Sequence, residues 1–194
     1  FVSIYWMATE DHDFDEINYF NFKDKKFRWN RESNGPVGRL STEGLDLVYE
    51  AFSKEIGLGN NAKYLLDLFK KSYLEHQNLA DATRFLANEL FKNEGLVIID
   101  GDAKELKKLF VPYAKNELIQ QTSFKKVNET LPLLEKYTIQ VNPREINLFY
   151  IQNKLRERII FENGHFVINN TKLKFTEKEL LIELENNPEN FSPN

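Results

Sequence analysis

The chain opens with a continuous run of apolar residues that is followed directly by a run of acids. Residues 1–8 are apolar except for Ser3, and residues 9–16 contain five acidic side chains around a single histidine. An unbroken apolar run predicts a β-strand buried on both faces, as in a parallel sheet. Ligands of open α/β sheets bind just beyond the carboxyl ends of such strands. The acidic run therefore occupies the position where this architecture usually places its chemistry.

The segments that follow alternate between strand and turn patterns. Residues 17–22 and 26–30 are rich in aromatic residues and flank a polar Lys-Asp-Lys sequence, which predicts a β-hairpin. Residues 33–38 contain two glycines and a proline, which predict a turn.

Between residues 41 and 91 the apolar positions recur at helical spacing and predict three consecutive helices. Asn78 is expected to cap the third helix, with Asp81 in its first turn. Three helices without an intervening strand indicate a helical insertion into an α/β core.

The remainder of the chain returns to a mixed pattern. A buried strand is predicted at 95–100, a helix opened by an Asp102–Glu105 capping box, and a further helix at 122–135. The remaining predicted strands are 137–141, 147–151, 158–161, 165–169 and 172–175. Asn163-Gly164 predicts a hairpin turn, and residues 176–179 predict a second capping box before a final helix.

This order of elements predicts an α/β fold with a helical insertion and a small β-hairpin region. We expect three segments: 1–40 with the first strand, the acidic motif and the hairpin; 41–93 with the helical insertion; and 94–194 with the α/β return and the C-terminal strands and helix.

Composition and net charge limit the classes of molecule that the chain is expected to bind. The chain has 194 residues, a net charge of −4 and no cysteine. A negative net charge predicts no binding to nucleic acid or to an anionic membrane surface, and the lack of cysteine excludes disulfides within this sequence. No apolar run reaches the roughly eighteen residues that a membrane span needs. Because the first residue already lies in a predicted strand, we expect an interior piece of a longer protein. The lack of cysteine is compatible with the cytoplasm, where we expect the protein to be located.

Four ionisable residues stand in succession after the first strand: Glu10, Asp11, His12 and Asp13. They cannot all enter a core, because burial of unpaired charge is costly. A carboxylate beside a histidine orients the imidazole and raises its basicity, which suits general acid–base catalysis. The alternative is a helix N-terminus, where acids are favoured by the helix dipole.

Asp11, His12 and Asp13 also offer the ligand types of a metal-dependent hydrolase. Neighbouring residues of a strand point to opposite faces, so these three side chains converge only if the chain turns sharply. We therefore expect contact with substrate and no metal. Of the other two histidines, His76 is expected on the surface and His165 in a hairpin strand.

A second polar group accompanies the later strands. Asn147 begins one of them, and Arg156 and Arg158 share a side if their segment is extended. The planar guanidinium matches a carboxylate or a phosphate, so the two arginines are a candidate anion clamp. Surface pairing with neighbouring glutamates is the alternative.

Several of these stretches resemble the BshC family, which is assigned the addition of cysteine in bacillithiol biosynthesis. The similar stretches are residues 4–18, 95–102, 144–150 with 156–158, and 191–194. The first is the most specific, because an apolar strand that ends in Glu-Asp-His-Asp-Phe is rare. The order of the stretches matches over nearly the whole sequence, which we interpret as a middle portion of the family's chain.

The resemblance implies a Rossmann-like core, similar to the nucleotidyl-transferase and class I synthetase superfamily. It implies a ligase that joins the carboxyl of cysteine to the amine of glucosaminyl-malate as an amide, with ATP or another nucleotide as cofactor. It also implies a homodimer formed through a C-terminal coiled coil. The family's glycine-rich segment and its coiled coil are absent from this sequence, so we expect this piece alone to be inactive.

The resemblance also implies site residues. Those expected to line the active-site cleft are Glu10, Asp11, His12 and Asp13, and those expected to bind substrate are Asn147, Arg156 and Arg158. A metal-dependent hydrolase at Asp11, His12 and Asp13 stays an alternative. So does a non-catalytic interaction domain that uses the helices of 41–91 as its contact surface.

Overall fold

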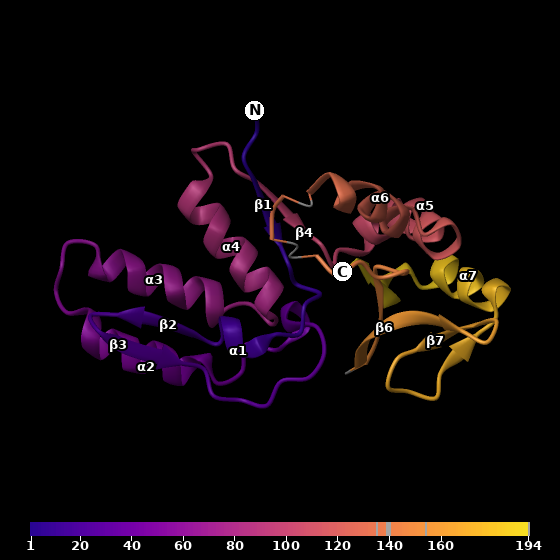
Figure 1. The fold of residues 1–194 in the computed structure, drawn as a ribbon. Helices are drawn as coiled ribbons and strands as arrows, with labels where there is room; N and C mark the ends of the chain where they lie inside the picture. Colours follow the sequence, from indigo (N-terminus) through magenta and orange to yellow (C-terminus); the bar gives the residue numbers. More distant parts are fainter. Residues whose placement is uncertain (135, 139–140, 154, 194) are drawn as a thin grey trace. The chain divides into compact units, whose positions relative to one another are not determined.

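The computed structural model describes residues 1–134, 136–138, 141–153 and 155–193. They form two compact units, unit 1 over Phe1–Gly101 and unit 2 over Asp102–Asn194. Both units combine helices with strands (Figure 1), which confirms the predicted α/β class.

Unit 1 is built around a parallel strand pair and an antiparallel hairpin. Its elements are β1 (Ile4–Met7), α1 (Phe14–Ile17), β2 (Tyr19–Phe22), β3 (Lys25–Arg28), the 3₁₀ helix η1 (Val37–Arg39), α2 (Leu45–Ile56), α3 (Ala62–Tyr73), α4 (Leu79–Phe91) and β4 (Val97–Asp100). β1 pairs in parallel with β4, with Ile4 opposite Val97 and Met7 opposite Asp100. The predicted first strand and the strand predicted at 95–100 therefore lie side by side.

The predicted hairpin is formed by β2 and β3. Lys23 and Asp24 have φ values of 47° and 61°, and two successive positive values are the geometry of a type I′ turn. The ring of Phe20 lies 5.3 Å from that of Phe52 in α2 and 6.3 Å from that of Phe69 in α3, measured between centroids. The hairpin and the two helices thus share one aromatic core.

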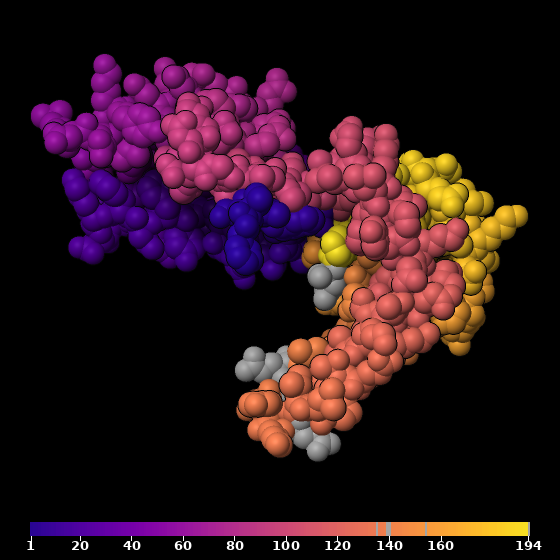
Figure 2. All heavy atoms as spheres, turned by 90° about the horizontal axis from the view of Figure 1, so that it is seen from above, coloured from indigo at the N-terminus to yellow at the C-terminus, as the bar shows by residue number. Residues whose placement is uncertain are grey.

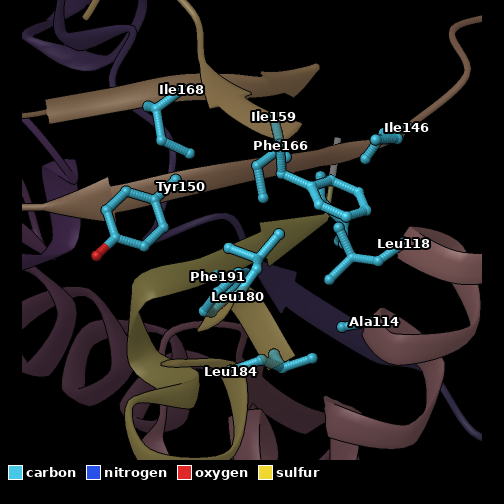
Figure 3. Packing of buried hydrophobic residues seen from close by; sticks show 11 residues of the cluster. Ala114, Leu118, Ile146, Tyr150, Ile159, Phe166, Ile168, Leu180, Leu184 and Phe191 are labelled. Carbon is cyan, nitrogen blue, oxygen red and sulfur yellow. The ribbon is translucent and has the colours of Figure 1, made fainter. Parts of the chain in front are cut away.

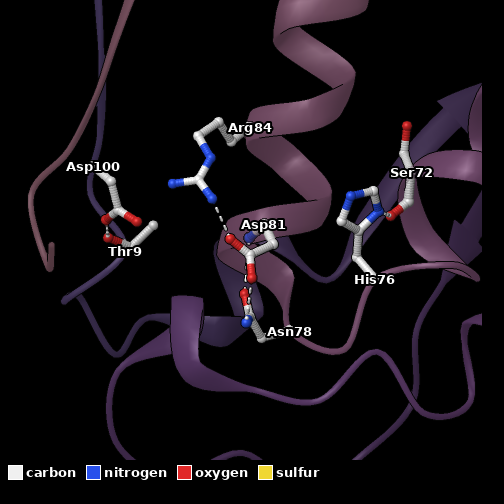
Figure 4. Close-up of polar contacts among 7 residues, drawn as sticks. All are labelled: Thr9, Ser72, His76, Asn78, Asp81, Arg84 and Asp100. Carbon is white, nitrogen blue, oxygen red and sulfur yellow. Dashed lines mark hydrogen bonds and ion pairs between the residues drawn. The ribbon is translucent and has the colours of Figure 1, made fainter.

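The three helices predicted between 41 and 91 are α2, α3 and α4. Asn78 caps α4 as expected, because its side-chain oxygen accepts a hydrogen bond of 2.8 Å from the backbone N–H of Asp81 (Figure 4). Such a cap typically stabilises a helix by about 1 kcal/mol. Local sequence therefore fixes where α4 begins.

The expectation that the first strand is buried on both faces is wrong within the described residues. Ile4 and Trp6 are 56% and 55% exposed, whereas Met7 is 2% exposed. The reason is that β4 is the one strand paired with β1 in the described structure, and a two-stranded pair leaves an edge and much of a face open. Figure 2 shows the N-terminal residues, in the darkest indigo, at the surface of unit 1.

Unit 2 packs helices against an antiparallel sheet. Its elements are α5 (Lys104–Gln120), α6 (Thr122–Thr130), the 3₁₀ helix η2 (Leu131–Leu134), β5 (Leu148–Gln152), β6 (Leu155–Glu162), β7 (His165–Ile168), β8 (Lys174–Phe175), α7 (Glu177–Asn186), the 3₁₀ helix η3 (Pro188–Asn190) and β9 (Phe191–Pro193). The strand order is β8-β7-β6-β5-β9. One face carries a hydrophobic cluster that includes Tyr150, Ile159, Leu180 and Phe191 (Figure 3).

Two turn and cap predictions for unit 2 are confirmed and one is wrong. Asn163 and Gly164 both have positive φ between β6 and β7, and Thr176 with Glu179 forms the predicted capping box. The Asp102–Glu105 box is absent, because α5 begins at Lys104 with Ala103 as its N-cap. The one-residue shift breaks the spacing that a capping box requires.

The segment between α6 and β5 also differs from expectation. The helix predicted at 122–135 ends at Thr130 and continues as a 3₁₀ turn, since Pro132 cannot donate to the helical ladder. Residues 137, 138 and 141 of the strand predicted at 137–141 are not in a strand. Residues 135, 139 and 140 lie outside the described residues.

A buried carboxylate joins three segments of unit 2. Glu117, 7% exposed, accepts hydrogen bonds from the backbone and side-chain nitrogens of Asn147 at 3.2 and 2.9 Å and from the backbone of Ser123 at 3.2 Å. Burial alone raises the pKa of Glu117, but these hydrogen bonds outweigh it and hold that pKa below its ordinary value. Glu117 thereby ties α5 to α6 and to the start of β5.

We expect Glu117→Gln to lower the free energy of unfolding at neutral pH by roughly 1–3 kcal/mol, since hydrogen bonds to charged acceptors contribute about that much. The folded-state pKa of Glu117 is depressed. Its contribution is therefore complete above the ordinary carboxyl pKa and is lost as pH falls through the folded-state pKa. Denaturant unfolding at several pH values should show the difference from wild type shrinking toward acid pH.

The matched control is Glu105→Gln, an exposed carboxylate on the same helix. A difference between wild type and Glu117→Gln that stays constant from pH 7 to pH 3 would contradict this role.

Candidate functional site

The carboxyl ends of β1 and β4 meet at one edge of unit 1. The parallel register places Met7 beside Asp100, and the backbone N–H of Gly101 donates to the Met7 carbonyl at 3.2 Å. Immediately past this point, the Thr9 hydroxyl donates to the Asp100 carboxylate (Figure 4). Residues that are far apart in the sequence thus share the edge at which α/β folds bind ligands.

A loop from later in the chain holds the acidic run in place. The backbone N–H groups of Val37 and Gly38 donate to the carbonyls of Asp11 at 2.7 Å and Thr9 at 2.8 Å. A Cβ at Gly38 would lie 2.4 Å from Thr9 Cβ, so only glycine permits this approach. We predicted a simple turn at residues 33–38, and the segment proves to be a clamp on the motif.

Glu10 is the buried member of the acidic run, at 5% exposure. A Cβ at Gly101 would lie 3.3 Å from Glu10 Oε2 and 3.1 Å from the Trp6 ring. Gly101 therefore leaves the room in which Glu10 and Trp6 lie against the end of β4. Neither Gly38 nor Gly101 was among the predicted site residues.

Asp11, His12 and Asp13 lie partly exposed in a turn between β1 and α1. His12 Nδ1 is 3.2 Å from Asp11 Oδ1, and His12 Nε2 is 3.8 Å from Asp13 Oδ1. The side chains are 43–56% exposed, so the imidazole lies between two hydrated carboxylates. Asp13 is also the N-cap residue of α1 but makes no side-chain cap bond.

One ligand atom from each of these three residues lies within 4.8 Å of the others. The sharp turn on which we made their convergence conditional is present, since the N–H of Asp11 donates to the Ala8 carbonyl at 3.1 Å. Two carboxylates and an imidazole form a donor set that suits a divalent cation. The same set also suits proton transfer with no ion.

An uncharged cavity of about 400 Å³ lies beside the end of β1. Its wall includes Thr9 and Gly38 of the clamp, Tyr5 of β1 and Tyr73 of α3, and the side chains of Glu10 to Asp13 are not part of it. Burial is the main cause that raises the pKa of Tyr73, whose hydroxyl hydrogen-bonds Thr83. Tyr73 was missed because its position in a helical apolar stripe gave no sign of a cavity wall.

The predicted substrate-binding residues lie in unit 2. Asn147 Nδ2 donates to Glu117 at 2.9 Å and to the Arg144 carbonyl at 3.2 Å, so this amide positions the chain before β5. Arg156 and Arg158 share one side of β6 as predicted, because both stack on the Phe149 ring, with Cζ 3.9 and 4.7 Å from its centroid.

The pKa of the Arg158 guanidinium lies below its ordinary value. Burial is the first cause that lowers its pKa, and the positive charges of Arg144 and Arg156 are the next. Two guanidiniums thus lie over one ring, with the charge of Arg144 within electrostatic reach of Arg158, and this arrangement favours an anionic ligand. Phe149, which organises the group, was not predicted, since an aromatic residue in a strand is normally a core residue.

In its geometry, unit 1 is an α/β unit whose parallel strand pair ends in a polar edge. The family model described as "Bacillithiol biosynthesis BshC, N-terminal Rossmann-like domain" matches residues 1–194, so the chain belongs to this family. The match is to an N-terminal domain, whereas we expected a middle portion.

Curated relatives agree with this assignment. The chain is 66% identical to a protein of Flavobacterium johnsoniae over 194 residues, 62% identical to one of Flavobacterium psychrophilum over 194 residues, and 31% identical to one of Bacillus anthracis over 212 residues. Each match covers all of this chain and 36–38% of the relative, and each relative is named "Putative cysteine ligase BshC". The chain thus spans little more than a third of the length of these relatives.

Among the described residues, no helix combines the length and hydrophobicity of a membrane span.

We expect Gly38→Ala to destabilise unit 1 by roughly 1–3 kcal/mol, the usual cost of overpacking. Thr9 or the loop must move to admit the new Cβ, which also loosens the carbonyl contacts that fix the acidic run. The free energy of unfolding should fall in denaturant titrations. Gly59→Ala is the control, because no heavy atom lies within 4 Å of a Cβ at Gly59. Equal stabilities of the two variants would refute the clamp.

Proposed function

We propose that the protein is a ligase that joins the carboxyl of cysteine to the amine of glucosaminyl-malate as an amide, in bacillithiol biosynthesis. The observation that carries the proposal is the match to the BshC family over residues 1–194. The name of its relatives agrees with it. The geometry supports two roles for the residues of this chain, proton transfer in unit 1 and anion binding in unit 2.

The proton-transfer role belongs to His12. Amide formation needs a neutral amine, so a base must take a proton from the nucleophile. In neutral His12 the contact with Asp11 assigns the hydrogen to Nδ1, which leaves Nε2 as the acceptor. Asp13 lies 3.8 Å from Nε2 and stabilises the imidazolium once the proton has moved. Asp11 orients the ring, and Glu10 helps to shape the end of β4.

The anion-binding role belongs to Arg156 and Arg158. Glucosaminyl-malate carries the carboxylates of malate, and paired guanidiniums on one ring offer planar, charge-assisted hydrogen bonds to such groups. An incoming anion also favours the charged form of Arg158, whose pKa burial and the charges of Arg144 and Arg156 lower. Asn147 contributes by fixing the segment that carries Arg144.

The nucleotide implied by the family resemblance fits the described edge of unit 1 poorly. The sequence has no phosphate-binding loop, the Thr9 hydroxyl is engaged with Asp100, and the neighbouring side chains are anionic. These groups would repel a polyphosphate. We therefore assign no step to a nucleotide at these residues, and activation of the cysteine carboxyl is left to groups beyond them.

The other properties implied by the resemblance complete the proposal. We propose a cytoplasmic homodimer that assembles through a C-terminal coiled coil, with residues 1–194 inactive on their own. The ligase is preferred to a metal-dependent hydrolase at Asp11, His12 and Asp13, and to a non-catalytic helical interaction domain, because the relatives' name describes a ligase.

We expect His12→Ala and Asp13→Ala in the full-length protein to lower kcat by roughly 10²-fold or more, the usual contribution of a general base. A strain that depends on the protein for bacillithiol should then lose the thiol, as measured by mass spectrometry. His165→Ala, at an exposed hairpin histidine, should leave production unchanged. Normal bacillithiol levels with soluble His12→Ala protein would remove His12 from the mechanism.

We expect Arg158→Gln and Arg156→Gln to raise KM for glucosaminyl-malate by roughly tenfold or more, because each charge-assisted hydrogen bond contributes about 1.5–3 kcal/mol. The KM for cysteine should stay near the wild-type value. Steady-state kinetics with each substrate varied in turn separates the two effects. Lys172→Gln, an exposed cation of unit 2, is the control. Equal changes in both KM values would argue against an anion clamp.

A further inference from the structure

The parallel pair of unit 1 has an open face and an open edge on the side of β1. β4 pairs with β1 on one side, and no other strand of the described residues pairs with β1 (Figure 1). Ile4 and Trp6 of β1 are 56% and 55% exposed, and Val97 of β4 is 43% exposed. These side chains share one face of the pair, because the register sets Ile4 opposite Val97 and Trp6 opposite Ile99.

The hydrogen bonds to β4 show which backbone groups of β1 face the open edge. The carbonyls of Ser3 and Met7 accept from the N–H groups of the first residue of β4 and of the residue after β4, at 3.0 and 3.2 Å. Alternate residues of a strand turn their backbone groups to the same side, so Tyr5 also faces β4. The N–H and C=O groups of Ile4 and Trp6 therefore point to the opposite edge, where they form a row that a further strand can pair with.

The sheet of unit 2 shows how this chain protects the edges of a sheet, and β1 lacks that protection. The edge strands of unit 2 are β8 and β9. β8 has two residues and begins at Lys174, and β9 ends at Pro193. A very short strand, a lysine and a proline each hinder the addition of another strand. Residues 1–8 contain no charged residue and no proline, so the edge of β1 is suited to pairing.

The length of the relatives indicates where a partner for this edge comes from. The chain covers 36–38% of each relative, so most of the family's polypeptide lies outside the matched residues. The matching family model describes a Rossmann-like domain. Sheets of that class have several mostly parallel strands and are covered on both faces. The β1–β4 pair is a small part of such a sheet.

A second copy of the chain is a less suitable partner for this edge. When two copies form one continuous sheet across a twofold axis, the same edge strand of each copy meets the other, and the two strands run antiparallel. The β1–β4 pair is parallel, and parallel strands are what the Rossmann-like class requires. A strand from elsewhere in the same polypeptide can be parallel, because a long connection leads to it.

We propose that a strand from the part of the full-length polypeptide outside residues 1–194 pairs in parallel with the open edge of β1, through the backbone groups of Ile4 and Trp6. Because this strand runs in the direction of β1, its carboxyl end lies at the sheet edge where Thr9 and Glu10 follow β1. The loop after it therefore brings further side chains to the candidate site. The pairing does not rest on the proposed ligase function, and its tests measure structure instead of activity.

Hydrogen exchange of the wild-type full-length protein, resolved to single residues by mass spectrometry with gas-phase fragmentation, tests the pairing. The N–H groups of Tyr5 and Met7 face β4 and are the internal reference for a paired strand. We expect the N–H groups of Ile4 and Trp6 to exchange about a hundredfold or more slowly than in an unstructured peptide, as in a strand paired on both sides. Slowing by less than this at either residue overturns the proposal.

A photo-crosslink identifies the strand that lies beside β1. Full-length protein with p-benzoylphenylalanine in place of Ile4 is irradiated, separated on a denaturing gel and digested for mass spectrometry. We expect a product with the mass of a monomer, in which position 4 is linked to a peptide outside residues 1–194. A link to a peptide within residues 1–194, or a product with the mass of a dimer, overturns the proposal.

The control places the same photoreactive residue at Tyr64, a residue of α3 that is 52% exposed. It should not capture the peptide that position 4 captures. Capture of the same peptide from both positions indicates random contact and also overturns the proposal. If the protein substituted at Ile4 does not fold, the exchange measurement on the wild-type protein decides alone.

Discussion

The parallel pairing of β1 with β4 is the constraint on which the candidate site of unit 1 depends. Both strands are short, and their register sets Met7 opposite Asp100. From that single alignment it follows that Thr9 meets Asp100 and that Glu10 lies against Gly101. The backbone clamp formed by Val37 and Gly38 then fixes the direction in which the acidic run leaves the sheet. A slip of one residue would turn each of these side chains to the opposite face.

Features that depend on local sequence were predictable, and features that depend on pairing across long separations were not. The Asn78 cap, the Thr176 capping box and the Asn163-Gly164 turn each follow from a few neighbouring residues. The contact between Gly38 and Thr9 joins separate segments and needs the fold itself. The exposure of Ile4 has the same cause, because an apolar run indicates what a strand can bury but not how many strands flank it.

The candidate site residues divide in the same way. The acidic motif was found because four ionisable residues after an apolar run leave few other interpretations. The predicted shared side for Arg156 and Arg158 is confirmed, since strand alternation is a local property. The part played by Phe149 was beyond prediction, because the ring's stacking on two cations is visible only once β5 and β6 are paired in register.

The acidic group of unit 1 and the arginine pair of unit 2 differ in what surrounds their charges. Asp11, His12 and Asp13 are partly exposed, so water reduces the cost of holding charge there when no substrate is bound. Arg156 and Arg158 stack on one aromatic ring, and burial, followed by the charges of Arg144 and Arg156, lowers the pKa of Arg158. Both guanidiniums are thus positioned on the ring before a ligand arrives, which lowers the ordering cost of binding an anion.

Two buried charged groups of unit 2 have structural roles. Glu117 accepts from Asn147 and Ser123, and Lys107, 3% exposed, donates to the Phe191 carbonyl at 2.6 Å. Each of these groups joins elements of unit 2 that the fold needs to hold together.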